Sequence, residues 1–365
     1  MFQKKNASKV DMIYDDLESR ILNGEWEIGN QIPTEAELAK KFNCSRGTVS
    51  KAIARLIHEG FVNSRTKSGT RVANKTSSRS REKVQLDAGA YIFPGEQHEA
   101  VSRIGQGFQR AACEEGRRVV TVTTGADFRK DAEIIGRLDE FDVKGAVVYP
   151  TLWAPRDRIY FEQMLLKCRF PVVLVDISLP GFGAPAVVID GYHAGYTITR
   201  HLLAQGIRKI GFLSNGAWVP SVQARYGGYC WALEEAGIER KPQWAFLEQE
   251  LHADFRNPVE RSHPFTRQYF KTAGSLEGVF CCDDFIALSC LATAKKMGLR
   301  VPEDLKVIGF GDYAISAKSG LTTYRVPYEE LGRKAFHVLA DRMLGQKVPE
   351  MDQLLRGHVV VRKSA

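Results

Sequence analysis

Charged side chains occur where several apolar runs of this sequence end. Asp176 closes the run PVVLVD, Asp283 and Asp284 follow GVFCC, and Asp312 follows KVIGF. Arg225 lies just inside a helical pattern that comes after the run KIGFLS. Carboxylates and a guanidinium that converge in a cleft can hydrogen-bond the hydroxyl groups of a sugar, which both donate and accept. These residues are therefore candidates to line a ligand-binding cleft.

Aromatic and acidic residues near other strand ends are candidates for the same site. Trp153 follows GAVVYP and Trp218 follows KIGFLS, so both could stack against a sugar ring; Phe93 and Glu96 follow the run AYIF. For the two tryptophans a place in the hydrophobic core is an equally open interpretation.

Some polar residues of this region have a structural role as their simpler interpretation. Asp284 is favoured as the N-cap of the following helix rather than as a ligand-binding residue, because Asp is a preferred N-cap. Ser221 and Asp190 also precede helical patterns and can act as caps in the same way.

Catalytic chemistry is not supported by the sequence. Asp283 and Asp284 are neighbours, so their side chains diverge and do not form a facing acid–base pair. The chain has no GxSxG, P-loop or HExxH pattern, and Gly105 and Gly107 fall inside a helical pattern. Its eight histidines have no metal-ligand spacing, and its seven cysteines include no CxxC pair, which favours reduced thiols. We expect a regulatory or binding protein without catalytic residues, cofactor or metal.

Strands that alternate with helices must position the strand-end residues. The continuous apolar runs are typical of strands buried on both faces, and helical patterns lie between them. Such alternation predicts doubly wound parallel sheets, and the number of runs favours two similar halves that face a cleft. The predicted strands lie at 90–93, 119–123, 145–150, 171–176, 186–190, 209–214, 278–282 and 306–310.

The first quarter of the chain differs from the rest in charge. Of the 51 Lys and Arg and 43 Asp and Glu residues, positions 1–83 hold 16 and 10, so most of the net charge of +8 lies there. A basic excess confined to one segment is expected where that segment binds a polyanion. The polar stretch NKTSSRSREKVQ, residues 74–85, then reads as a linker. We predict a domain at 1–75, a linker at 76–86 and a second domain at 87–365.

Three helices and a hairpin can be read in the first domain. The pattern Thr34-x-x-Glu37 is a capping box, and Ser45 is a natural N-cap for a helix that buries Val49, Ile53 and related residues. Two short helices joined by a tight turn form a helix-turn-helix, whose second helix enters the major groove of DNA. The run FVNSRTKSGTRVA predicts two strands, which make a wing. The candidate DNA-contacting residues are Thr34, Ser45, Arg46, Thr48, Ser50, Lys51, Arg65, Lys67, Gly69 and Thr70.

The segment GEWEIGNQIPTEAELAKKFNCSRGTVSKAIARLIHEGFV, followed by SGTRV, resembles the winged-helix domain of the GntR family. The resemblance covers residues 9–72 and implies that Ser45, Arg46, Thr48 and Gly69 contact DNA. Two positions depart from the family pattern: Ala36 and Ser50 stand where an arginine is often found, with Lys51 beside the second. The operator sequence therefore does not follow from the resemblance.

The remainder of the chain resembles the LacI/GalR-type sensor, which is related to periplasmic sugar-binding proteins. The resemblance rests on GVFCCDDFIALSCLATAKKMGLRVPEDLKVIGFGD, GLTTYRVPYEELGRKA, SVQARYGGYCWALEEAG and PVVLVD. It implies a two-lobed fold in which Arg225 and Asp283 bind the ligand, with Asp176 and Asp312 at or beside the ligand. Asp283 replaces the usual asparagine and Gly311-Asp312 the usual Asp-Asp, so no particular sugar can be carried over.

Together these features predict an α/β protein with an N-terminal winged helix-turn-helix and a two-lobed sensor. We expect a cytoplasmic, ligand-responsive repressor that binds operator DNA and a carbohydrate-like effector and that forms a homodimer. The polar N-terminus and the absence of an apolar run of ~20 residues argue against a membrane association. The alternative left open is a constitutive DNA-binding scaffold whose sensor-like domain only dimerises.

Overall fold

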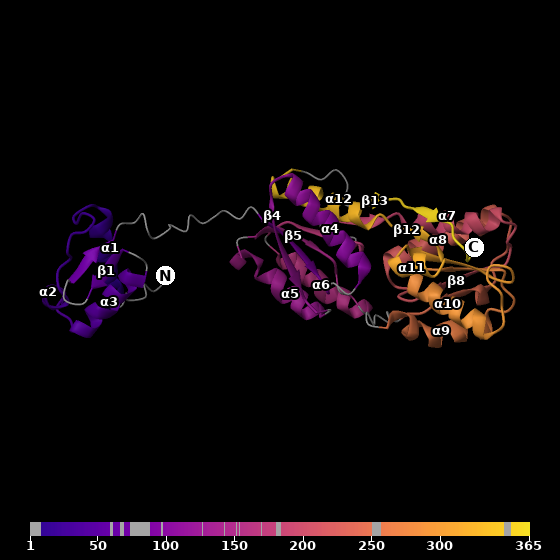
Figure 1. The fold of residues 1–365 in the computed structure, drawn as a ribbon, viewed down its shortest axis with the longest axis horizontal. Coiled ribbons are helices and arrows are strands. Elements are labelled where there is room, and N and C mark those ends of the chain that lie inside the picture. The colour runs from indigo at the N-terminus through magenta and orange to yellow at the C-terminus, as the bar shows by residue number, and fades with distance from the viewer. Residues whose placement is uncertain are drawn as a thin grey trace. The chain divides into compact units, whose positions relative to one another are not determined.

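A computed structural model describes residues 9–58, 61–65, 69–73, 88–95, 98–125, 127–141, 143–150, 152, 154–168, 170–179, 184–249, 257–346 and 352–365. The chain divides into two compact units, Met1–Gln85 and Leu86–Ala365 (Figure 1). The described part contains no helix that is long and apolar enough to cross a bilayer.

The first unit contains three helices and a two-stranded hairpin. They are α1 (Lys9–Leu22), α2 (Glu35–Lys41), α3 (Arg46–His58), β1 (Val62–Arg65) and β2 (Gly69–Val72), and the two strands are antiparallel. Buried side chains from all five elements form one core, which includes Leu17, Leu38, Ile53 and Val62. The predicted helix-turn-helix and hairpin are thus both present.

The second unit begins with a lobe built on a six-stranded parallel sheet. In spatial order its strands are β13 (Asp352–Leu355), β7 (Ala186–Ile189), β6 (Val172–Val175), β5 (Val143–Val148), β3 (Ala88–Phe93) and β4 (Arg118–Thr123). Helices α4 (Glu99–Glu114) and α12 (Tyr328–Met343) pack against each other on one face (Figure 1). Helices α5 (Phe128–Gly136) and α6 (Pro155–Lys167) cover the other face.

The second lobe has the same layered plan. Its sheet order is β14 (His358–Val360), β12 (Thr322–Arg325), β11 (Lys306–Gly311), β10 (Gly278–Cys281), β8 (Ile210–Ser214) and β9 (Ala245–Leu247), and only β14 runs antiparallel to its neighbour in this sheet. Helices α7 (Gly191–Ala204) and α8 (Pro220–Glu235) pack on one face, and α9 (Pro258–Thr272) and α10 (Asp284–Lys296) on the other. The short helix α11 (Ala314–Lys318) follows β11.

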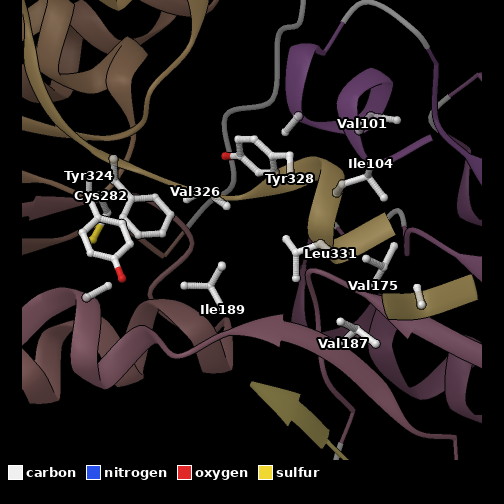
Figure 2. Packing of buried hydrophobic residues seen from close by; sticks show 14 of the residues in the cluster. Val101, Ile104, Val175, Val187, Ile189, Cys282, Tyr324, Val326, Tyr328 and Leu331 are labelled. Atoms are coloured by element: carbon white, nitrogen blue, oxygen red, sulfur yellow. The ribbon is translucent and has the colours of Figure 1, made fainter. Parts of the chain in front are cut away.

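Three segments carry the chain between the lobes. They join β7 to α7, β12 to α12, and β13 to β14. One hydrophobic cluster continues from lobe to lobe beside these segments. Figure 2 shows Val175, Val187 and Ile189 of the first sheet, Tyr324 of the second, and Val326 and Tyr328 of the segment that joins β12 to α12. At the same place Asp190 is tied to the third segment, because its backbone N–H donates to the carbonyl of Leu355 at 2.8 Å and its carboxylate pairs with Arg356 at 3.0 Å.

All eight predicted strands form, and they are divided between two sheets as the two-halves hypothesis requires. Four further strands, β9, β12, β13 and β14, were not predicted. One expectation about burial is wrong for β4: it is an edge strand, and Arg118, Thr121 and Thr123 are exposed instead of being buried on both faces.

Candidate functional site

The turn between α2 and α3 places the start of α3 at the surface. Asn43 adopts a left-handed conformation with φ of 45°, which Asn tolerates, and the backbone N–H of Cys44 donates to the carbonyl of Ala39 at 3.1 Å. Ser45 then caps α3, since its Oγ accepts a hydrogen bond from the Thr48 backbone N–H at 3.2 Å and lies 2.8 Å from the Thr48 hydroxyl. The predicted cap is therefore confirmed.

The outer face of α3 carries the predicted contact residues. Arg46, Ser50 and Lys51 are exposed, while Val49 and Ala52 are buried against the core. The free backbone N–H groups of a helix N-terminus attract phosphate, and exposed basic and hydroxyl side chains beside them add charge and donors. This face of α3 can therefore bind a nucleic-acid backbone and reach base edges.

The hairpin and α2 place the other predicted contact residues. Thr34 and Glu37 form a reciprocal capping box at the start of α2. Gly69 begins β2 with φ of 72°, a left-handed conformation that favours glycine, and a Cβ there would displace the end of the Gln31 side chain. Thr70 is half-buried in β2, Arg65 lies in β1, and Lys67 lies outside the described residues.

In the second unit, a cavity of about 230 Å³ lies at the carboxyl ends of strands from both lobes. The first lobe contributes Asp176 and Tyr149, which follow β6 and β5, together with Tyr328 of α12. The second lobe contributes Arg225 of α8 and Asp283, which follows β10. Strand ends of doubly wound sheets are the usual place for a ligand site.

Asp176 presents a half-buried carboxylate on the first-lobe side of the cavity. Its backbone has φ of 69°, a conformation that Asp tolerates better than most residues, and the Tyr149 hydroxyl donates to its Oδ2 at 2.8 Å. Burial raises the pKa of Asp176, while the Tyr149 hydrogen bond and the charge of Arg225 act in the opposite direction.

Asp283 presents the facing carboxylate. It is the N-cap of α10, because its Oδ1 accepts from the backbone N–H of Phe285 at 2.7 Å, and its Oδ2 accepts from the Tyr313 hydroxyl at 3.3 Å. Burial, and after it the charge of Asp284, raise the pKa of Asp283 to about 7, although Arg225 and the two hydrogen bonds oppose the shift.

The prediction that Asp284 is the N-cap is wrong, because α10 begins one residue after Asp283 and Asp284 already lies in its first turn. The fully buried Asp284 instead holds the segment that follows β11: its carboxylate accepts from the Tyr313 backbone N–H at 3.0 Å, the Ser316 hydroxyl at 2.6 Å and the Thr323 hydroxyl at 2.5 Å. This arrangement fixes the position of Tyr313 on the cavity wall.

Arg225 supplies the positive charge of the cavity. Its guanidinium lies 4.1 Å from the centre of the Phe310 ring, and its two terminal nitrogens are 3.5 Å from the Cys282 carbonyl and the Ser221 hydroxyl. Its Nε is buried and has no hydrogen-bond partner among the described residues. Helix α7 packs closely against the backbone of Arg225, because a Cβ on Gly195 of α7 would overlap the carbonyl group of Arg225. Close packing of α7 on α8 thus sets the position of this side chain.

Ser221 and Asp190 differ in their observed roles. Ser221 is not a cap: α8 begins at Pro220 after Val219, and Ser221 lines the cavity. Asp190 does cap α7, as predicted, by accepting from the His193 backbone N–H at 2.9 Å.

Three further predicted ligand residues, Phe93, Trp218 and Asp312, do not line the cavity. Phe93 is buried and stacks on Tyr91, with ring centroids 4.9 Å apart. Trp218 packs against the first-lobe core, and its buried Nε1 has no partner among the described residues. Asp312 is bound by Arg325 at 2.5 Å and Arg362 at 2.6 Å, so its carboxylate is already neutralised by protein groups. Glu96 and Trp153 lie outside the described residues.

Several cavity residues were missed by the sequence reasoning. Tyr149 directly follows β5, and Tyr313 comes two residues after β11. Their place near the end of a predicted strand could therefore have identified both as cavity residues. Tyr328 and His98 stand at the starts of α12 and α4 and had no comparable signal. His98 packs edge-on against Phe285 and Tyr313 of the other lobe, with ring centroids 6.3 Å and 5.5 Å apart. Burial lowers the pKa of His98 to about 4.

Comparison with known proteins agrees with this two-part organisation. Residues 9–72 match the family of bacterial regulatory proteins called gntR, and residues 199–365 match a periplasmic binding protein-like domain. An arabinose metabolism transcriptional repressor of Geobacillus stearothermophilus is 25% identical over 99% of both chains. The transcriptional repressor CytR of Escherichia coli is 32% identical over 58% of this chain and 59% of its own length.

Solved structures show the same fold. The transcription regulator CcpA of Lactococcus lactis superposes with a TM-score of 0.67 at 22% identity, covering 77% of this chain and 99% of its own. A complex of the regulator CelR with cellobiose gives 0.66 at 22% identity, over 98% of this chain and the whole of the other. The chain therefore joins a GntR-type helix-turn-helix domain to a two-lobed periplasmic-binding-protein-like domain, and its homologues are LacI/GalR-like transcriptional repressors.

Proposed function

We propose that this protein is a ligand-responsive transcriptional repressor, in which α3 and the hairpin bind operator DNA and the two-lobed unit binds a small, sugar-like effector. The observation that carries the proposal is the convergence of Asp176 from one lobe with Arg225 and Asp283 from the other on one cavity, in a chain that also carries a winged helix.

DNA binding is supported by the chemistry of the α3 surface. Ser45 and Thr48 hold hydroxyls at the helix N-terminus, and Arg46 is exposed beside them. Arginine can bind guanine through two hydrogen bonds or pair with phosphate. In a homodimer, two such helices would read half-sites about one turn of DNA apart.

Coupling is supported by contacts that already join the two lobes around the cavity. Glu99 of α4 accepts from the Ala314 backbone N–H at 2.8 Å, and the Tyr328 hydroxyl donates to that of Tyr313 at 3.3 Å. An effector that touches Asp176 and Asp283 together stabilises one arrangement of the lobes over others. A ~100-fold preference for that arrangement supplies roughly 2.7 kcal/mol of coupling to DNA affinity.

The DNA-binding part is tested with a duplex selected by the full chain from a random-sequence pool. Fluorescence anisotropy should show that Arg46→Ala weakens binding by at least about 5-fold, as expected for a base contact worth ~1–3 kcal/mol. Arg20→Ala is the matched control, since it removes the same charge from α1, where Arg20 pairs with Glu25. Equal affinity of the wild-type chain and Arg46→Ala would refute the role of α3.

The sensor part is tested by adding sugars and nucleosides to that protein–DNA complex. Release or tightening of the duplex by one compound, lost in Arg225→Ala, is the expected result. A complex that responds to no compound, in a chain that none of them stabilises against heat, would favour the constitutive scaffold instead.

A further inference from the structure

The hydrogen bonds around the two cavity carboxylates have a fixed direction. Above the pKa of about 7 of Asp283, where its carboxyl is ionised, it can only accept, so the hydroxyl hydrogen of Tyr313 points to Asp283. In the same way the hydroxyl hydrogen of Tyr149 points to the carboxylate of Asp176. Tyr313 has then used its only hydrogen, so Tyr328 must donate to it. These three tyrosines therefore turn their hydrogens toward protein oxygens and leave lone pairs for a ligand.

The charges of the cavity wall also favour a ligand that donates hydrogen bonds. Among the described lining residues, Asp176 and Asp283 are the acids and Arg225 is the only Lys or Arg. His98 adds no positive charge at neutral pH, because burial holds its pKa at about 4. Among the described residues, the wall thus carries two carboxylates against one guanidinium.

We propose that the cavity selects an uncharged molecule rich in hydroxyl or amine hydrogens and rejects the phosphorylated or carboxylated form of the same molecule. This inference rests on the effector-binding function proposed above and narrows its ligand class. A phosphate or carboxylate would bring further negative charge to a wall whose described residues already carry more negative than positive charge. Like charges brought together in a buried interface cost several kcal/mol.

The test compares matched compounds on the full-length protein at pH 8, above the pKa of about 7 of Asp283. L-Arabinose, D-ribose, D-glucose and cytidine are each titrated beside a phosphorylated form, and the sugars also beside their aldonic acids, with binding followed by thermal shift and calorimetry. For any compound that binds, the neutral form should bind at least ~100-fold more tightly than its anionic partner, which corresponds to about 2.7 kcal/mol.

A pair of variants connects that discrimination to the cavity charge. Asp176→Asn keeps the side-chain shape, and Asn tolerates the left-handed backbone of this position. It should lower the ratio of neutral to anionic affinity at least 10-fold. Asp304→Asn is the control, because it removes the same charge from a residue that pairs with Arg300 and does not line the cavity. This control should leave the ratio unchanged.

The possible outcomes distinguish a failure of the proposed charge selectivity from a failure of the proposed effector binding. If an anionic form binds as tightly as its neutral partner, or if Asp176→Asn leaves the ratio unchanged, the proposed charge selectivity is wrong while effector binding stands. If no compound of the panel binds, the effector-binding function fails and the inference fails with it.

Discussion

Replacing Asp283 by asparagine should remove a specific part of the pH dependence of stability. Burial raises the pKa of this carboxyl from 3.8 in the unfolded chain to about 7 in the folded protein. A difference of about 3 pKa units corresponds to roughly 4 kcal/mol between the two protonation states. Because the folded state holds the proton more tightly, stability falls as pH rises above 3.8, and the loss is complete above about 7.

The substitution Asp283→Asn isolates this effect. Asparagine caps a helix about as well as aspartate, so the hydrogen bond from Phe285 N–H is retained. Asp284, Tyr313 and Arg225, which face Asp283, are present in both proteins, so their own titration largely cancels in the comparison. Between pH 5 and pH 8 the variant should therefore gain about 2–3 kcal/mol of stability relative to the wild-type chain.

Urea denaturation followed by far-UV circular dichroism at pH 5, 6, 7 and 8 measures that gain. Asp304→Asn serves as the control, because hydrogen bonds with Arg300 lower the pKa of Asp304 to about 2 and keep it ionised over this range. Parallel stability curves for the wild-type chain and Asp283→Asn would refute the argument that a buried carboxyl is forced to ionise at this position.

Three further substitutions test the packing and the site. Gly332→Ala should destabilise the second unit by about 1–3 kcal/mol in urea denaturation, because its Cβ would overlap a backbone carbonyl of α4; Gly136→Ala, with open space around it, should not. Asp190→Ala should cost about 1–2 kcal/mol in the same assay by removing a helix cap, whereas Asp190→Asn should cost less because it loses only the ion pair with Arg356. Arg225→Lys should weaken the binding of any sugar that stabilises the wild-type chain at least 10-fold by calorimetry, since lysine cannot reproduce the planar guanidinium over Phe310; equal affinity would place the ligand elsewhere.

Strands were predicted correctly where burial on both faces makes every residue of the strand apolar, because such a run can be recognised in the sequence. Runs such as AVVI of β7 are covered on both faces and therefore apolar at every position. The missed strands β12, with the sequence TTYR, and β13, with DQLL, mix polar and apolar residues. The threonines of β12 are buried because their hydroxyl groups form hydrogen bonds inside the protein, for example from Thr323 to Asp284. A search for apolar runs cannot detect a strand of this kind.

The cavity residues could be predicted where they directly follow buried strands, because the carboxyl ends of parallel strands lie at the same edge of a sheet. Asp176, Asp283 and Arg225 follow buried strands along the chain, and all three line the cavity. Asp312 also follows a strand, but its carboxylate forms an ion pair with Arg362, which lies 50 residues later in the sequence. The carboxylate therefore stabilises the fold and does not line the cavity. The pairing partner of a strand-end residue depends on tertiary contacts of this kind, which spacing along the sequence does not contain.

The passage of the chain between the lobes has a consequence for the order in which the protein can be completed during synthesis. All elements of the DNA-binding unit lie within residues 9–72, so this unit can fold early on the ribosome. The edge strands β13 and β14, one for each lobe, both come from residues 352–360. Neither sheet of the second unit can be completed until almost the whole chain has emerged. A product that ends before residue 352 would carry a complete first unit beside two lobes that each lack an edge strand.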